Sequence, residues 1–246
     1  MLSFFKTKPP VLPEIDFSSL GTDLHSHIIP GIDDGARDLS ESIALIRTIL
    51  DLGFQKIITT PHVMVDYYRN TPETIKTGLS ILKKALLSEN LDIEIEAAAE
   101  YYLDEDLENK LDNNEILPFG DNYLLFEISF SNFPVNLSEI VEKMISKGYK
   151  PILAHPERYS YLHGSITNYR RIKDVGCLFQ LNTISLTGYY GKPTQKAAEM
   201  LVDKMLIDFI GSDMHHLKHA QALKFALKHP YVYRLLTDYP LQNELL

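Results

Sequence analysis

The sequence predicts an α/β protein whose parallel strands close into a TIM-like (β/α)7 barrel forming a single domain. Short β-branched segments alternate strictly with amphipathic segments through seven βα units. Histidine, aspartate or glutamate side chains follow the ends of six of the seven predicted strands. A length of 246 residues is also typical of one barrel of this kind.

Composition indicates a soluble globular protein and narrows the classes of partner. Hydrophobic residues make up 45% of the chain and charged residues 23%. The net charge of −9 argues against a nucleic-acid-binding surface. No apolar run is long enough to span a bilayer, and residues 1–5 are too short for a signal peptide, so we expect a cytoplasmic protein without membrane insertion.

The N-terminal segment differs in character from the rest of the chain. Residues 6–20 contain Pro9, Pro10 and Pro13, which favour an extended strap laid on the domain. We therefore expect residues 1–20 to form this strap and residues 21–246 to form the barrel.

The first half of the chain contains four predicted strands and three helices. A strand at 22–25 precedes a helix from Ser40 to Gly53, which Asp38 or Ser40 caps. Leucines and isoleucines at helical spacing predict the long helix 72–89. The other predicted elements are strands 55–60, 93–99 and 123–126 and a helix at 104–111.

The second half continues the same alternation. Gly148 and Gly176 end two of its helices. The predicted strands are 150–154, 177–181 and 207–211, and the helices are 137–147, 166–174, 194–204, 219–227 and 231–237.

The side chains at the strand ends favour a closed sheet over an open one. In a (β/α) barrel the carboxyl ends of all strands converge on one face, whereas an open sheet spreads them about 4.8 Å per strand. Eight or nine ligands are too many for one ion and imply two or three bridged metals, an arrangement used for hydrolysis at phosphorus. The residues concerned are His25, His27, His62, Glu100, Glu127, His155, Asp213 and His215.

Together with the Asp33-Asp34 turn, these motifs resemble the polymerase and histidinol phosphatase (PHP) superfamily. HSH at 25–27, PH at 61–62, AAE at 98–100, FE at 126–127, AHPERY at 154–159 and SDMH at 212–215 are most similar to its bacterial CpsB/CapC protein-tyrosine phosphatase branch. The resemblance implies a distorted seven-stranded barrel with a trinuclear site for manganese, iron or zinc. It implies nine metal ligands: His25, His27, Asp34, His62, Glu100, Glu127, His155, Asp213 and His215.

Spacing to His27 favours Asp34 over Asp33 as the ligand, with Asp33 capping the turn. Glu100 and Glu127 have two oxygens each and are natural bridges between ions. A hydroxide shared by two metals could attack phosphorus without a protein nucleophile.

Other residues are candidates for substrate contact. Arg158 is placed to bind a phosphate through two parallel hydrogen bonds, although it could instead pair with Glu157. Arg69 is a second candidate, and Tyr67 and Tyr102 could form an apolar cleft for a phosphotyrosine ring, although either could simply pack its loop. We take Arg158 and Asp34 as the catalytic candidates.

The favoured function is hydrolysis of phosphotyrosine by a metal-dependent phosphatase. A cysteine-based mechanism requires an arginine six residues after the cysteine, and Thr183 stands six residues after Cys177. The resemblance implies a role in capsule and exopolysaccharide synthesis, with the tyrosine-rich tail of a tyrosine autokinase as partner. The alternatives are another phosphoesterase, acting on histidinol phosphate or another small ester, and a non-enzymatic metal-binding component of polysaccharide export.

Overall fold

The computed structural model describes residues 13–246 and contains an α/β fold with two wholly parallel sheets. The smaller sheet has the strand order β1-β2-β4 and the larger has the order β3-β5-β6-β7-β8-β9. The strands are β1 (Thr22–Leu24), β2 (Lys56–Thr59), β3 (His62–Val63), β4 (Glu94–Ala97), β5 (Glu100–Tyr102), β6 (Tyr123–Glu127), β7 (Lys150–Ala154), β8 (Leu178–Asn182) and β9 (Phe209–Gly211).

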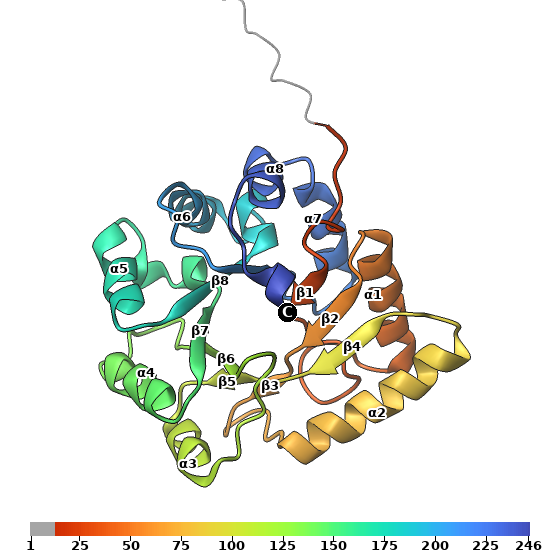
Figure 1. The fold of residues 1–246 in the computed structure, drawn as a ribbon, viewed down its shortest axis with the longest axis horizontal. Coiled ribbons are helices and arrows are strands. Elements are labelled where there is room, and N and C mark those ends of the chain that lie inside the picture. The colour runs from red at the N-terminus through yellow and green to blue at the C-terminus, as the bar shows by residue number, and fades with distance from the viewer. Residues whose placement is uncertain (1–12) are drawn as a thin grey trace, which may run out of the picture.

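Helices surround the strands on the outside of the molecule (Figure 1). Asp38 caps the first of them by accepting a hydrogen bond from the Glu41 backbone N–H at 2.9 Å. No helix among residues 13–246 is both long and apolar enough to cross a membrane. The helices are α1 (Leu39–Asp51), α2 (Pro72–Ser88), α3 (Glu105–Asn113), α4 (Leu137–Ser146), α5 (Ile166–Asp174), α6 (Lys192–Asp203), α7 (Leu217–Ala226) and α8 (Pro230–Thr237).

The structure contains two short strands that the sequence does not predict, β3 and β5, each directly after a predicted strand. The segment predicted at 55–60 forms β2, and β3 begins at His62 after Pro61, which has no N–H to donate to a ladder. The segment predicted at 93–99 forms β4, and β5 begins at Glu100. The other predicted elements agree with the observed ones to within two residues at their ends.

At one edge the same two chain segments run from the smaller sheet into the larger, and at the other edge a bridge joins the two sheets. At the breaks, the Ala98 N–H donates to the Thr59 carbonyl at 2.9 Å and the Glu100 N–H donates to the Pro61 carbonyl at 3.1 Å. On the other side, the chain after β1 pairs with the chain after β9, because Ser26 and Met214 form a parallel bridge. The first and last strands of the chain therefore lie side by side.

The described part of the N-terminal segment packs on this body. The Phe17 ring is buried and stacks on Phe54 with ring centroids 4.6 Å apart. Its backbone N–H donates to the Leu52 carbonyl at 2.9 Å. Of the prolines that suggested a strap, Pro9 and Pro10 lie outside the described residues.

Candidate metal centre

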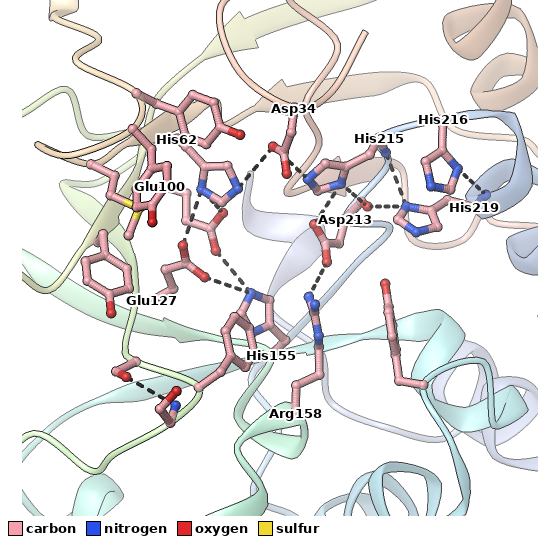
Figure 2. A pocket seen from close by; sticks show the side chains of 18 residues that line it. Asp34, His62, Glu100, Glu127, His155, Arg158, Asp213, His215, His216 and His219 are labelled. Atoms are coloured by element: carbon pink, nitrogen blue, oxygen red, sulfur yellow. Dashed lines mark hydrogen bonds and ion pairs between the residues drawn. The ribbon is translucent and has the colours of Figure 1, made fainter.

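All nine predicted metal ligands meet at the carboxyl ends of the strands. Figure 2 shows seven of them around the cavity: Asp34, His62, Glu100, Glu127, His155, Asp213 and His215. In four overlapping groups, one potential ligand atom from each member lies within 4.8 Å of the others. The groups are His25, Glu100 and His155; His25, His27 and Asp213; His62, Glu100 and Glu127; and His27, Asp34, His62 and His215.

Glu100 lies at the centre of this cluster. Its Oε2 is 3.1 Å from His25 Nε2 and 3.2 Å from His62 Nδ1. Its Oε1 is 3.2 Å from His155 Nε2. These separations are those of neighbouring ligands that share an ion at about 2.1 Å from each. Glu127 faces the same space, with Oε1 3.4 Å from His62 Nδ1.

Asp33 and Asp34 turn in different directions. Asp34 Oδ1 lies 3.5 Å from both His62 Nε2 and His215 Nε2, on the ligand side. Asp33 Oδ2 instead contacts His27 Nδ1 at 2.8 Å, and its Oδ1 accepts from the Gly35 N–H at 3.0 Å. Asp33 thus holds both the turn and the His27 ring.

Supporting residues orient the imidazoles so that one nitrogen of each faces the centre. Gln180 Oε1 lies 2.7 Å from His25 Nδ1, as Asp33 does from His27 Nδ1. The Asp213 carbonyl is 2.9 Å from His215 Nδ1. Such contacts set the tautomer that leaves Nε2 without a proton and able to bind a metal.

Four of the inward atoms make no hydrogen bond within the described residues. His25 Nε2, His27 Nε2, His62 Nδ1 and Glu100 Oε2 are all buried and unpaired. Buried polar atoms are almost always satisfied, so four unpaired atoms facing one point indicate a missing ligand. Imidazole nitrogens and carboxylate oxygens are a donor set that suits manganese, iron and zinc, so these residues fit divalent cations.

Three of the nine residues have a left-handed backbone. The φ angles are 85° at His25, 35° at His155 and 48° at Asp213. Such angles cost of order 1–3 kcal/mol outside glycine and are concentrated at functional sites. These three residues follow strand ends, where the left-handed backbone directs their side chains toward the ligand cluster.

Burial and neighbouring charges shift the pKa values of several residues in the cluster. Burial and the nearby charge of Glu100 raise the pKa of Glu127 well above its usual value. Burial and the charge of Arg158 lower the pKa of His155 to about 4. Although burial raises the pKa of Asp34, contacts with His215 and His62 lower it to about 2.

Arg158 joins the cluster through Asp213. Its Nη1 donates to Asp213 Oδ2 at 2.8 Å. Its guanidinium also contacts the rings of Phe130 and Tyr190, at 5.0 and 4.4 Å from their centroids. The alternative of an ion pair with Glu157 is not seen. That carboxylate is buried and accepts from the Asn182 N–H at 3.1 Å and the Ser185 hydroxyl at 2.6 Å.

A cavity of about 620 Å³ opens over the cluster. Four of the candidate site residues, Arg158, Asp34, Tyr67 and Tyr102, line it. Arg69 does not line it: this side chain is exposed and its Nε donates to the Val65 carbonyl at 2.7 Å. The loop after β3 therefore contributes its tyrosines and not its arginine.

The sequence interpretation missed several supporting residues. Gln180 and Asn182 lie on β8, where two amides in the otherwise apolar run LFQLN are the signal that was available. Asn182 Nδ2 donates to Asp213 Oδ2 at 2.8 Å. His219, four residues after His215, also lines the cavity.

The Cys177 thiol is buried and is not suited to act as a nucleophile. Burial raises the pKa of its thiol to about 12, so the thiol stays protonated at neutral pH. The structure thus agrees with the exclusion of a cysteine-based mechanism.

Comparisons with known proteins agree with the resemblance. A family model described as "Capsular polysaccharide synthesis, CpsB/CapC" matches residues 21–232. Tyrosine-protein phosphatase YwqE of Bacillus subtilis is 30% identical over 211 residues, covering 84% of this chain and 83% of the relative. CpsB of Streptococcus pneumoniae, also named a tyrosine-protein phosphatase, is 29% identical over 201 residues, covering 79% and 83%.

Solved structures agree as well. A crystal structure from work on YwqE and CpsB, described as unique metal-dependent tyrosine phosphatases, matches with a TM-score of 0.80 and 30% identity, covering 92% of this chain and 93% of that one. An organophosphorus hydrolase from Deinococcus radiodurans, with a TM-score of 0.53 and 13% identity over 92% of this chain and 91% of that one, shares the fold alone. With residues 21–232 matched by the family model and a relative 30% identical over 84% of the chain, this chain belongs to the CpsB/CapC family.

Proposed function

We propose that this protein is a metal-dependent protein-tyrosine phosphatase whose nine convergent ligands hold two or three divalent cations, with manganese the first candidate and iron or zinc the others. The observation that carries the proposal is the set of four buried, unpaired nitrogen and oxygen atoms facing one point under an open cavity. Bound cations would supply Lewis-acid stabilisation of the phosphoryl group and lower the pKa of water.

The chain's own residues would bind and orient the substrate. Arg158 keeps further N–H groups beyond the one used by Asp213, and a guanidinium can bind two phosphoryl oxygens at once. Tyr67 and Tyr102 would flank the phenyl ring of phosphotyrosine. Asp34 at the mouth stays ionised at neutral pH, because its pKa is about 2.

The fold would gather these residues as a closed, distorted (β/α) barrel made of both sheets, with residues 21–246 as one catalytic domain and the segment before them as a strap. Two observations support closure: the pairing of the same two chain segments continues across the breaks before β3 and β5, and the Ser26–Met214 bridge joins the opposite edges. The hydrogen bond from Phe17 to Leu52 supports the strap.

The protein substrate would be the phosphorylated, tyrosine-rich tail of a bacterial tyrosine autokinase that governs capsule or exopolysaccharide synthesis, and the enzyme would act in the cytoplasm. The names of the relatives, tyrosine-protein phosphatases of the capsular polysaccharide family, support this substrate class. The net charge of −9 disfavours nucleic acid as an alternative substrate.

A substrate panel tests the proposal. Purified protein would be assayed with a phosphotyrosine peptide, histidinol phosphate and a nucleotide, each with manganese and with a chelator. We expect the phosphopeptide to be preferred and the chelator to abolish activity. Preference for histidinol phosphate would overturn the substrate, and activity that survives the chelator would overturn the metal mechanism.

A further inference from the structure

A second cavity, of about 380 Å³, lies between helices α4 and α5, which are neighbours in Figure 1. We call it the side pocket. Its walls are largely apolar, with Phe133, Leu137, Tyr161 and Ile172 among the lining residues. Arg171 also lines it and is exposed, which places a hydrogen-bond donor at the rim.

One short loop separates the side pocket from the catalytic cavity. Ser129, Phe130 and Ser131 line the catalytic cavity, and Phe133 lines the side pocket. The Tyr161 hydroxyl, from the side pocket, donates to the Ser129 carbonyl at 2.5 Å. The two cavities thus share a wall.

A continuous aromatic row runs along this wall. The Phe130 ring lies 5.2 Å from that of Tyr159, which stacks on Tyr161 at 5.9 Å, and Tyr161 meets Phe133 edge-on at 6.0 Å. Phe130 and Phe133 are each 44% exposed. Phe130 at the catalytic cavity and Phe133 at the side pocket therefore leave exposed apolar surface at both cavities, and exposed apolar surface of this kind can serve as a binding surface.

We propose that the side pocket binds an apolar side chain of the phosphoprotein substrate, close in sequence to the phosphotyrosine. The inference rests on the proposed function and extends it to the peptide around the scissile phosphate. Residues three apart in a chain are at most about 11 Å apart, so an extended peptide crosses from Phe130 to Phe133 in about three residues. The volume and apolar lining suit a leucine or an aromatic residue, and Arg171 can donate to a peptide carbonyl.

The test uses phosphotyrosine peptides with a glycine-serine background and one leucine moved from four residues before to four residues after the phosphotyrosine. We expect leucine at one position, about three residues away, to raise kcat/KM about tenfold through a lower KM. Phe133→Ala should remove this preference, lowering about tenfold the ratio of kcat/KM for the best peptide to that for a small aryl phosphate.

Val135→Ala is the matched control, because Val135 is 98% exposed in the same loop and lines neither cavity. It should keep the leucine preference. Equal rates for all leucine positions, or an equal loss in both variants, would overturn the side pocket while leaving the phosphatase proposal intact. Sedimentation that shows Phe133→Ala dissociating an oligomer, with the leucine preference unchanged, would assign the pocket to a contact between copies instead. Failure to hydrolyse both the aryl phosphate and every peptide would overturn the phosphatase function itself.

Discussion

At the scale of single residues, the candidate metal centre depends on which atom of each side chain faces inward. Gln180 and Asp33 each contact the Nδ1 of a histidine and so leave its Nε2 for a cation. The two carboxylate oxygens of Asp213 have different partners. Its Oδ1 lies 3.4 Å from His25 Nε2, and its Oδ2 accepts hydrogen bonds from Arg158 and Asn182. One carboxylate therefore connects the ligand cluster to the residue proposed to bind phosphate.

Replacing Arg158 tests its role in binding phosphate. We expect Arg158→Ala to lower kcat/KM for a phosphotyrosine peptide about 100-fold, because a charged donor to the transferred phosphoryl group is lost. Arg158→Lys should recover only part of this, since an ammonium cannot make two parallel contacts.

The control for this experiment is Arg69→Ala, in which an exposed arginine outside the cavity is removed. It should retain normal activity. Metal content must be measured in every variant, because Arg158 also holds Asp213. A wild-type rate in Arg158→Ala would exclude the arginine from phosphate binding.

Replacing Asp33 tests the support of His27. Asp33→Ala should weaken manganese binding about ten- to 100-fold, as is typical when the partner of a ligating histidine is removed. Metal retained after dialysis against buffered manganese is the measurement. Asp66→Ala, an exposed aspartate in the loop after β3, should bind manganese normally. Unchanged affinity in Asp33→Ala would show that the His27 ring needs no such support.

At the scale of elements, the ends of short strands decide where the ligands lie. The breaks before β3 and β5 let His62 and Glu100 begin new strands, directly paired in register across the ladder. On the opposite side, β9 approaches β1 so closely that a Cβ on Gly211 would lie 1.8 Å from the Leu24 carbonyl oxygen. Only glycine allows this contact, which brings Asp213 beside His25.

Gly211→Ala should therefore destabilise the protein by about 3 kcal/mol or more, because the added methyl group meets backbone that must move. The free energy of unfolding in urea is the measurement. Gly164→Ala is the comparison: its added Cβ meets open space, and a φ of 77° costs an alanine about 1 kcal/mol. Equal losses in the two variants would mean that the β1–β9 contact yields easily.

At the scale of the whole molecule, residues that follow six different strands, or lie at their ends, contribute to one cluster of buried charged side chains. Glu100, Glu127 and Asp213 are all buried within it, and burial together with the charges of Glu100 and Asp213 raises the pKa of Glu127. Cations bound at this cluster would connect the start of the chain to its end. They would bind the folded state alone, because the unfolded chain does not bring the ligands together.

Removal of metal should accordingly lower the melting temperature. Saturation at about 100 times Kd contributes about 2.7 kcal/mol, which corresponds to a shift of roughly 5–10 °C for a chain of this length. Calorimetry of the chelated and manganese-loaded protein is the measurement, with magnesium as the control because this nitrogen-rich donor set suits it poorly. The same melting temperature with and without manganese would contradict the proposed centre.

The sequence by itself determined the α/β class, the order of helices and strands, and the nine candidate ligands. Strand and helix patterns are local, and the motifs HSH, AHPERY and SDMH can be read without coordinates. The tertiary structure alone decided the breaks at Pro61 and Glu100, the divergence of Asp33 from Asp34, and the distance of Arg69 from the cavity. It also decided that Arg158 pairs with Asp213 and not with Glu157. These features depend on contacts between residues far apart in the chain, and periodicity carries no information about such contacts.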